Sequence, residues 1–157
     1  MRFLAKLSAV GLAIVLASAC SSSSPKASAP SSTVVVTKAS YLVKANAICK
    51  TMNSRTAAVP APGHDPKKAA AAIDQQRAIV DQTLRQLRAL PVPAGQGPQL
   101  EAVYATVDKV IAATAAYSTA VRAGDLAAAT AAAKQIIATQ TRANAASIKY
   151  GLTVCGS

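Results

Sequence analysis

The chain has 157 residues and a formal net charge of +11, from 17 lysine and arginine residues against six aspartate and glutamate residues. With no tryptophan, one phenylalanine and four tyrosines, it must build its core mainly from alanine, valine, isoleucine and leucine. Its single glutamate and single histidine are too few for the di-iron sites of helical bundles. The chain also contains no nucleophile elbow, phosphate-binding loop or dinucleotide-binding fingerprint. We therefore expect no enzyme activity, no cofactor and no metal site.

Residues 1–19 have the three-part build of a secretory signal. Arg2 and Lys6 form a positive start, residues 7–16 are an uncharged apolar run, and residues 17–19 are small. The uncharged span over residues 7–19 is 13 residues long. A membrane-spanning helix needs roughly 20. We therefore expect an exported chain without a permanent transmembrane anchor.

The sequence LASAC at residues 16–20 resembles the bacterial lipobox, in which small residues precede a cysteine that receives diacylglycerol. Ala17 departs from the pattern, because leucine is most common at that position. The resemblance implies that the signal peptide 1–19 is removed and that Cys20 is lipidated. It places the protein on the extracytoplasmic face of the cell membrane, held by the lipid anchor. The alternative is an ordinary cleavage after Ala19 that leaves Cys20 as an unmodified thiol.

Residues 20–37 are expected to form a disordered tether. The stretch 21–33 is rich in serine, proline and alanine and has almost no large apolar group, so it cannot offset the entropy of ordering. About 17 residues of such chain have a root-mean-square reach on the order of 20–25 Å. The tether would hold the folded domain, residues 38–157, clear of the membrane surface.

The first two predicted helices cover about residues 38–59 and 65–90. In the first, apolar residues fall on one face at steps of four, three and four, namely Tyr41, Ala45, Ile48 and Met52. In the second, Asp65 is a cap residue and Pro66 suits the first helical position. Prolines after each segment end the helices.

The third and fourth predicted helices run from Leu100 to a break at Gly124, and from Leu126 to about Tyr150. In the third, steps of three and four continue through Leu100, Val103, Val107, Val110, Thr114, Tyr117 and Val121. In the fourth, Asp125 is the cap, and Leu126, Ala129, Ala133 and Ile136 share the face expected to pack inward. The connections are short enough to predict an all-α, up-down-up-down four-helix bundle, with the first and fourth helices as antiparallel neighbours.

The chain has three cysteines, an odd number for an exported protein. Assigning Cys20 to the lipid leaves Cys49 and Cys155, which we expect to form a disulfide in an oxidising envelope. The tail after the fourth helix would emerge near the start of the first and fold back to reach Cys49. The alternative is two free thiols. Two cysteines and His64 do not make a zinc site.

Two segments resemble a known family. YLVKANAIC at residues 41–49 and YGLTVCG at 150–156 are similar to segments of small secreted lipoproteins of actinobacteria, mycobacteria included, which pair A-x-x-I-C near the start with Y-G-L-x-x-C-G at the end. The resemblance covers the signal and both cysteine segments, while the middle of the chain is only generically similar. It implies a lipid-anchored, helical, disulfide-tied domain outside the cytoplasmic membrane, and it implies no activity.

A few polar residues are candidates for a site. His64 stands in a turn and is expected to be a solvent-exposed loop residue. Asp74 and Asp81 resemble a carboxylate pair, but Arg77 and Arg85 stand three and four residues away, and solvated ion pairs account for all four.

Tyr104 and Tyr117 are the candidates to line a small-molecule cleft, with packing in or at the rim of the core as the alternative. The leading functional hypothesis is a non-enzymatic binding or interaction module. The alternative is a carrier that holds a lipid or other hydrophobic molecule between its helices.

The positive charge indicates an anionic partner. Without residues 1–19 the chain keeps 15 basic and six acidic side chains. Export and the absence of a dense basic run argue against nucleic acid. Anionic lipid, a wall polymer or another envelope protein is the expected partner. A basic surface that is merely solvated is the alternative.

Overall fold

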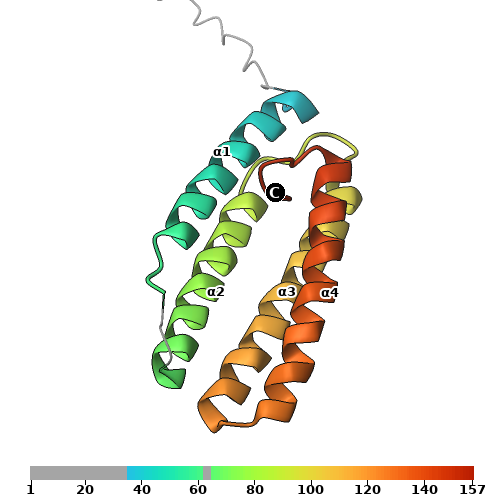
Figure 1. Ribbon diagram of the computed structural model, residues 1–157. Coiled ribbons are helices and arrows are strands. Elements are labelled where there is room, and N and C mark those ends of the chain that lie inside the picture. Colours follow the sequence, from blue (N-terminus) through green and yellow to red (C-terminus); the bar gives the residue numbers. More distant parts are fainter. Residues whose placement is uncertain (1–34, 62–64) are drawn as a thin grey trace, which may run out of the picture. The chain divides into compact units, whose positions relative to one another are not determined.

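The computed structural model describes residues 35–61 and 65–157, and these are helical, with no strand among them. The described helices are α1 (Lys38–Ala57), α2 (Pro66–Arg88), α3 (Gly97–Ala123) and α4 (Leu126–Tyr150) (Figure 1). All four belong to one compact unit, Val34–Ser157. The all-α prediction with four helices is confirmed. The predicted signal peptide, Cys20, most of the tether and His64 lie outside the described residues.

Side-chain caps mark the starts of three helices, and glycines mark the ends of two. Thr37 and the serine three residues later form a capping box at the start of α1. The carboxylate of Asp65 accepts from the backbone of the first turn of α2 at 2.8 Å, and Asp125 does the same for α4 at 2.9 Å. Gly124 and Gly151 end α3 and α4 with φ of 69° and 111°, left-handed values that favour glycine.

Three helix bounds differ from the prediction, and one of them is the end of α2, at Arg88 rather than at Leu90. Helix α3 begins at Gly97, three residues before Leu100, because Pro98 fits a first helical turn, where its missing N–H would have no intrahelical partner. Helix α1 ends at Ala57 rather than near Val59. The folded unit also begins before residue 38, because Val36 packs against the core and Thr37 caps α1.

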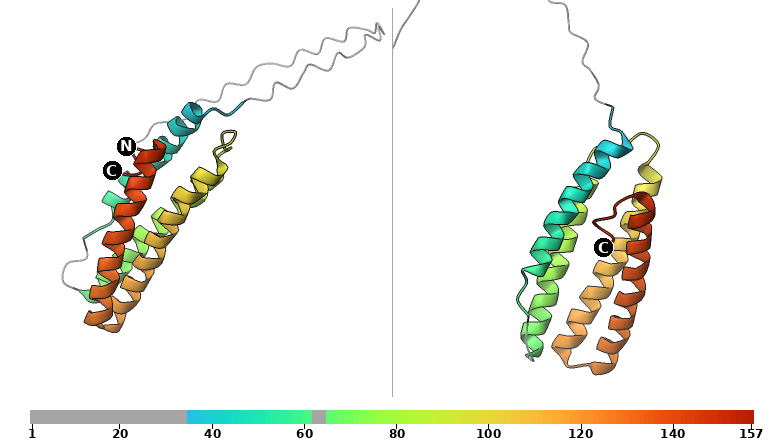
Figure 2. Two further views of the ribbon diagram at one scale, coloured as in Figure 1. Left: turned by 90° about the vertical axis from the view of Figure 1, so that its right-hand side faces the viewer. Right: turned by 45° about the horizontal axis from the view of Figure 1, so that its top comes forward.

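Successive helices run antiparallel, and each packs on the next along the chain (Figures 1 and 2). Helix α3 lies between α2 and α4, and α2 lies between α1 and α3. The expectation that α1 and α4 are direct neighbours is wrong, because no Cα atom of one lies within 8 Å of the other. The ring of four helices is therefore closed on three sides and left without direct helix packing on the fourth.

The large buried side chains gather at the end of the unit where α1 begins and α4 ends. They are Tyr41, Leu84, Leu87, Leu100, Tyr104, Tyr150 and Leu152. At the other end the contacts are small and polar: the Ser118 hydroxyl donates to the Ala70 carbonyl at 3.3 Å, and Arg122 pairs with Asp74. The packing is therefore stronger at the end that the predicted tether enters.

The predicted inward face of α4 is wrong in its first turn. Leu126 is 81% exposed, while the buried residues of the helix are Thr139, Ala143, Ser147 and Tyr150. This helix is so rich in alanine that an apolar residue stands on nearly every side, and the sequence periodicity does not select one face. The register is instead set by the residues near its end that meet the core.

Candidate functional site

The C-terminal tail, residues 151–157, fills the upper part of the opening between α1 and α4 (Figures 1 and 2). The Val154 backbone N–H donates to the Asn46 side chain at 3.2 Å, and Asn53 donates to the Val154 carbonyl at 3.1 Å. On the other side, a Cβ added at Gly156 would lie only 2.7 Å from the Ile148 side chain. The tail thus lies between the two helices and contacts both, where their backbones do not pack closely on each other.

A disulfide between Cys49 and Cys155 fixes the tail to α1, with 5.1 Å between the Cα atoms. The predicted pairing of these two cysteines is confirmed, and so is the fold-back of the tail. Leu152, only 1% exposed, inserts into the core beside the bridge. The bridge joins residues 106 positions apart, so it links the first helix to the end of the chain.

A cavity of about 70 Å³ lies below the tail, among all four helices. Its walls are mostly apolar and include Met52, Leu84, Val107 and Ala143. Sites that hold drug-sized ligands usually measure roughly 300–1,000 Å³. The cavity therefore has room for a small apolar group and not for a whole lipid.

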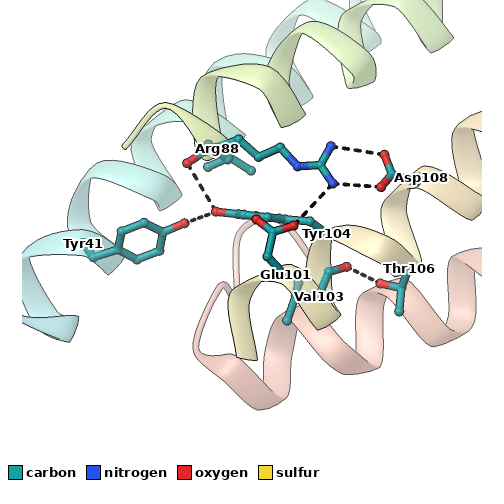
Figure 3. Close-up of polar contacts among 8 residues, drawn as sticks. Tyr41, Arg88, Glu101, Val103, Tyr104, Thr106 and Asp108 are labelled. Atoms are coloured by element: carbon teal, nitrogen blue, oxygen red, sulfur yellow. Dashed lines mark hydrogen bonds and ion pairs between the residues drawn. The ribbon is translucent and has the colours of Figure 1, made fainter. Parts of the chain in front are cut away.

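Three tyrosines from different helices meet in the core. The hydroxyls of Tyr41 on α1 and Tyr104 on α3 hydrogen-bond each other (Figure 3). The Tyr104 hydroxyl also lies 3.3 Å from the Leu87 carbonyl at the end of α2. The ring of Tyr150, on α4, meets the Tyr41 ring edge-on at a centroid distance of 6.2 Å. This cluster connects all four helices through polar and aromatic contacts.

Arg88 covers the outer side of the tyrosine cluster. Its guanidinium lies 5.4 Å from the centroid of the Tyr104 ring and donates to both carboxylate oxygens of Asp108, at 2.8 and 3.3 Å (Figure 3). Glu101 lies 3.7 Å from the same guanidinium. Such partly exposed ion pairs contribute little to stability individually. The arginine thus covers the ring of Tyr104 and is itself held by the two carboxylates.

Burial raises the pKa of all three clustered tyrosines. For Tyr41 the hydrogen bond with Tyr104 raises the pKa further, while for Tyr104 that bond partly opposes the effect of burial. For Tyr150 the cause is mainly burial. A tyrosine with a raised pKa stays protonated in the folded protein at a pH where it ionises in the unfolded chain. Its contribution to stability is present below pH about 10 and is lost as the pH rises further.

We therefore expect the free energy of unfolding to fall as the pH rises from about 9 to about 11, because tyrosine titrates near 10 when unfolded. Urea unfolding across this range would measure it. In a Tyr41→Phe variant the slope should be shallower, since one raised pKa is removed. The same slope in the variant and the parent protein would contradict the assignment.

The two tyrosines singled out in the sequence do not share a cleft. Tyr104 lines the central cavity, and Tyr117 lines an open hollow with the end of α1 and the start of α2. The sequence alone did not identify Tyr41 as the partner of Tyr104. The spacing of Tyr41 indicates a buried helix face, but a local pattern cannot show that two residues 63 positions apart will be in contact.

The predicted ion pairs are confirmed. Asp74 lies 3.7 Å from Arg77, and Asp81 pairs with Arg85. Within residues 35–61 and 65–157 there is no group of three or more histidine, cysteine, aspartate or glutamate side chains that could hold a metal. No helix in this part of the chain is long and apolar enough to cross a membrane.

Comparison of the chain with protein-family models, curated proteins and solved structures finds no match.

Proposed function

We propose that this protein is a non-enzymatic, lipid-anchored binding module of the cell envelope. It binds its partner with the side of the helical unit that lies between α1 and α4, which we call the uncovered side. The observation that carries the proposal is the side where α1 and α4 do not pack on each other. The edge of this side on α4 exposes Leu126, Ile137 and Ile148 to 81%, 68% and 52%.

The three exposed residues of α4 form a line along the helix. They stand 11 residues apart, which is close to three helical turns, so their side chains point in nearly the same direction. Large aliphatic side chains aligned on a surface are typical of interaction sites. The small central cavity gives the carrier hypothesis no comparable support, and that hypothesis stays a prediction.

The anchor is supported by the cysteines. Cys49 and Cys155 pair with each other, so Cys20 is the remaining cysteine of the chain. A disulfide is typical of an exported protein. The apolar run before Cys20 and the lipobox-like sequence around it then give the third cysteine a role that needs no partner thiol.

Metabolic labelling with a fatty-acid analogue tests the anchor. We expect label on the parent protein and none on a Cys20→Ser variant, while a Cys49→Ala, Cys155→Ala variant, the matched control, keeps it. Label retained after Cys20→Ser would contradict the assignment.

Site-specific photocrosslinking in intact cells tests the binding side. A photoreactive residue at position 137 on α4 should give a discrete crosslinked product. One at Ala112, an exposed position on α3, should not. Equal products from both positions would exclude the uncovered side as the binding surface.

A further inference from the structure

The charges of the folded unit are divided between its helices. Helix α1 carries four basic residues and α4 carries three, and neither helix contains an acidic residue. The basic residues are Lys38, Lys44, Lys50 and Arg55 on α1, and Lys134, Arg142 and Lys149 on α4. The two helices that border the uncovered side are therefore purely cationic.

All six acidic residues of the chain lie elsewhere and are engaged. Asp65 and Asp125 cap helices, and the other four form ion pairs with arginines of α2 and α3, namely Asp74, Asp81, Glu101 and Asp108. No ion pair among residues 35–61 and 65–157 involves α1 or α4. All four arginines of α2 and α3 are thus paired, and these two helices together carry seven basic and four acidic residues. Helices α1 and α4 carry seven basic residues and no acidic one; Lys38 stacks on the Tyr150 ring and Arg55 donates to Gln82, and the other five are exposed to an external anion.

Aliphatic side chains are exposed beside these cations. Val43 is 73% exposed and stands seven residues, about two helical turns, before Lys50, so these two side chains lie on the same face of α1. On α4, the exposed Ile137 follows Lys134 by three residues, which places them on neighbouring positions of the helix surface. Lysines around single exposed aliphatic residues are the combination that binds an anionic bilayer, with charges at the headgroups and apolar tips at the interface.

We infer that the surface formed by α1 and α4 docks on an anionic lipid bilayer. Charge complementarity selects this occupant over a second copy of the chain, because two such surfaces would repel each other. Helix α1 also directly follows the tether, whose reach of about 20–25 Å keeps this surface near the membrane that holds Cys20. The inference rests on the proposed function for placing the unit at a membrane, and it names the surface that faces the lipid.

The test uses a chain that begins at residue 21, which keeps the whole compact unit Val34–Ser157 and lacks the acylation site. Failure of this test is therefore independent of whether Cys20 is lipidated. Sedimentation with vesicles of phosphatidylglycerol and phosphatidylcholine should show binding that weakens with salt. Vesicles of phosphatidylcholine alone should bind little.

Two variants with the same net charge distinguish binding by the α1–α4 surface from binding that depends only on the total charge. Replacing Lys44, Lys50 and Lys134 by glutamine should weaken binding to the anionic vesicles about 100-fold, since each lysine near such a surface contributes roughly fivefold. Replacing Lys67, Lys68 and Lys109 by glutamine removes three exposed lysines of α2 and α3 and should change binding less than about threefold. Circular dichroism confirms that both variants are folded.

Equal losses in the two variants would overturn the inference, because binding would then follow net charge alone. Absence of binding to anionic vesicles would overturn it as well, and would leave the uncovered side to a protein partner. A dimer in solution whose interface protects Ile137 from labelling would assign the surface to a second copy.

Discussion

Replacing Cys49 and Cys155 by alanine is expected to lower the free energy of unfolding by about 3–5 kcal/mol. The bridge joins residues 106 positions apart, and closing so long a loop restricts the unfolded chain strongly. In the folded protein it also holds the tail between α1 and α4, whose Cα atoms do not come within 8 Å of each other. Losing the bridge therefore removes the covalent part of the connection between α1 and α4, which otherwise consists of the Tyr41–Tyr150 contact and the hydrogen bonds of Asn46 and Asn53 to Val154. Chemical denaturation of the parent and the double variant measures the difference.

The matched control is Cys20→Ala, which removes a cysteine without affecting the bridge and should leave the free energy of unfolding unchanged. Hydrogen exchange adds a local test. Without the bridge, amides of α1 should lose more protection than those of α3, because the backbone of α1 packs closely on α2 alone, whereas α3 has a closely packed helix on both sides. A loss of stability below about 1 kcal/mol would show that the tail docks without help from the disulfide.

Truncating Tyr41 to alanine is expected to lower the free energy of unfolding by about 3–5 kcal/mol, as for other large aromatic side chains removed from a core. Its side chain is 1% exposed, contacts the Tyr150 ring and hydrogen-bonds Tyr104. Replacement by phenylalanine keeps the ring and should cost only about 1–2 kcal/mol, because the Tyr104 hydroxyl retains the Leu87 carbonyl as a partner.

A double-mutant cycle of Tyr41→Phe with Tyr104→Phe isolates the hydroxyl pair. Since the two hydroxyls share one hydrogen bond, the double variant should lose less stability than the two single variants together. Tyr117→Phe serves as the control, because Tyr117 lies in a separate hollow of the structure, and its effect should add to that of Tyr41→Phe. Strict additivity of the Tyr41 and Tyr104 effects would mean that the pair contributes nothing as a pair.

The tyrosine cluster and the bridged tail lie at the same end of the unit, where α1 begins. The cluster ties α1 to α3, the bridge ties α1 to the end of the chain, and the residues between them form the main core. The opposite end has smaller buried side chains, such as Ala70 and Ser118. This arrangement gives firm packing near the predicted tether, and the proposed binding surface lies on the outer sides of α1 and α4.

The sequence alone determined the helices and the bridge. Asp65, Asp125 and Gly124 mark helix ends through interactions within a few residues, so no knowledge of the fold is needed to locate them. Assigning Cys20 to the lipid left Cys49 and Cys155 as the expected pair, with two free thiols as the alternative, and the pairing is confirmed. The signal peptide, the lipidation of Cys20 and the tether stay predictions.

Only the tertiary structure decided how the first and last helices meet. In a helix as rich in alanine as α4, apolar residues lie on every side, so the periodicity left its inward face open and placed Leu126 wrongly. Leu152 and Val154 of the tail pack against the core where α1 and α4 do not pack closely on each other. Whether α4 or the tail packs there depends on contacts between residues far apart in the sequence. The Tyr41–Tyr104 pair depends on the same long-range geometry. The sequence already shows that α1 and α4 contain basic but no acidic residues. Only the fold shows that these two helices border the same side of the unit.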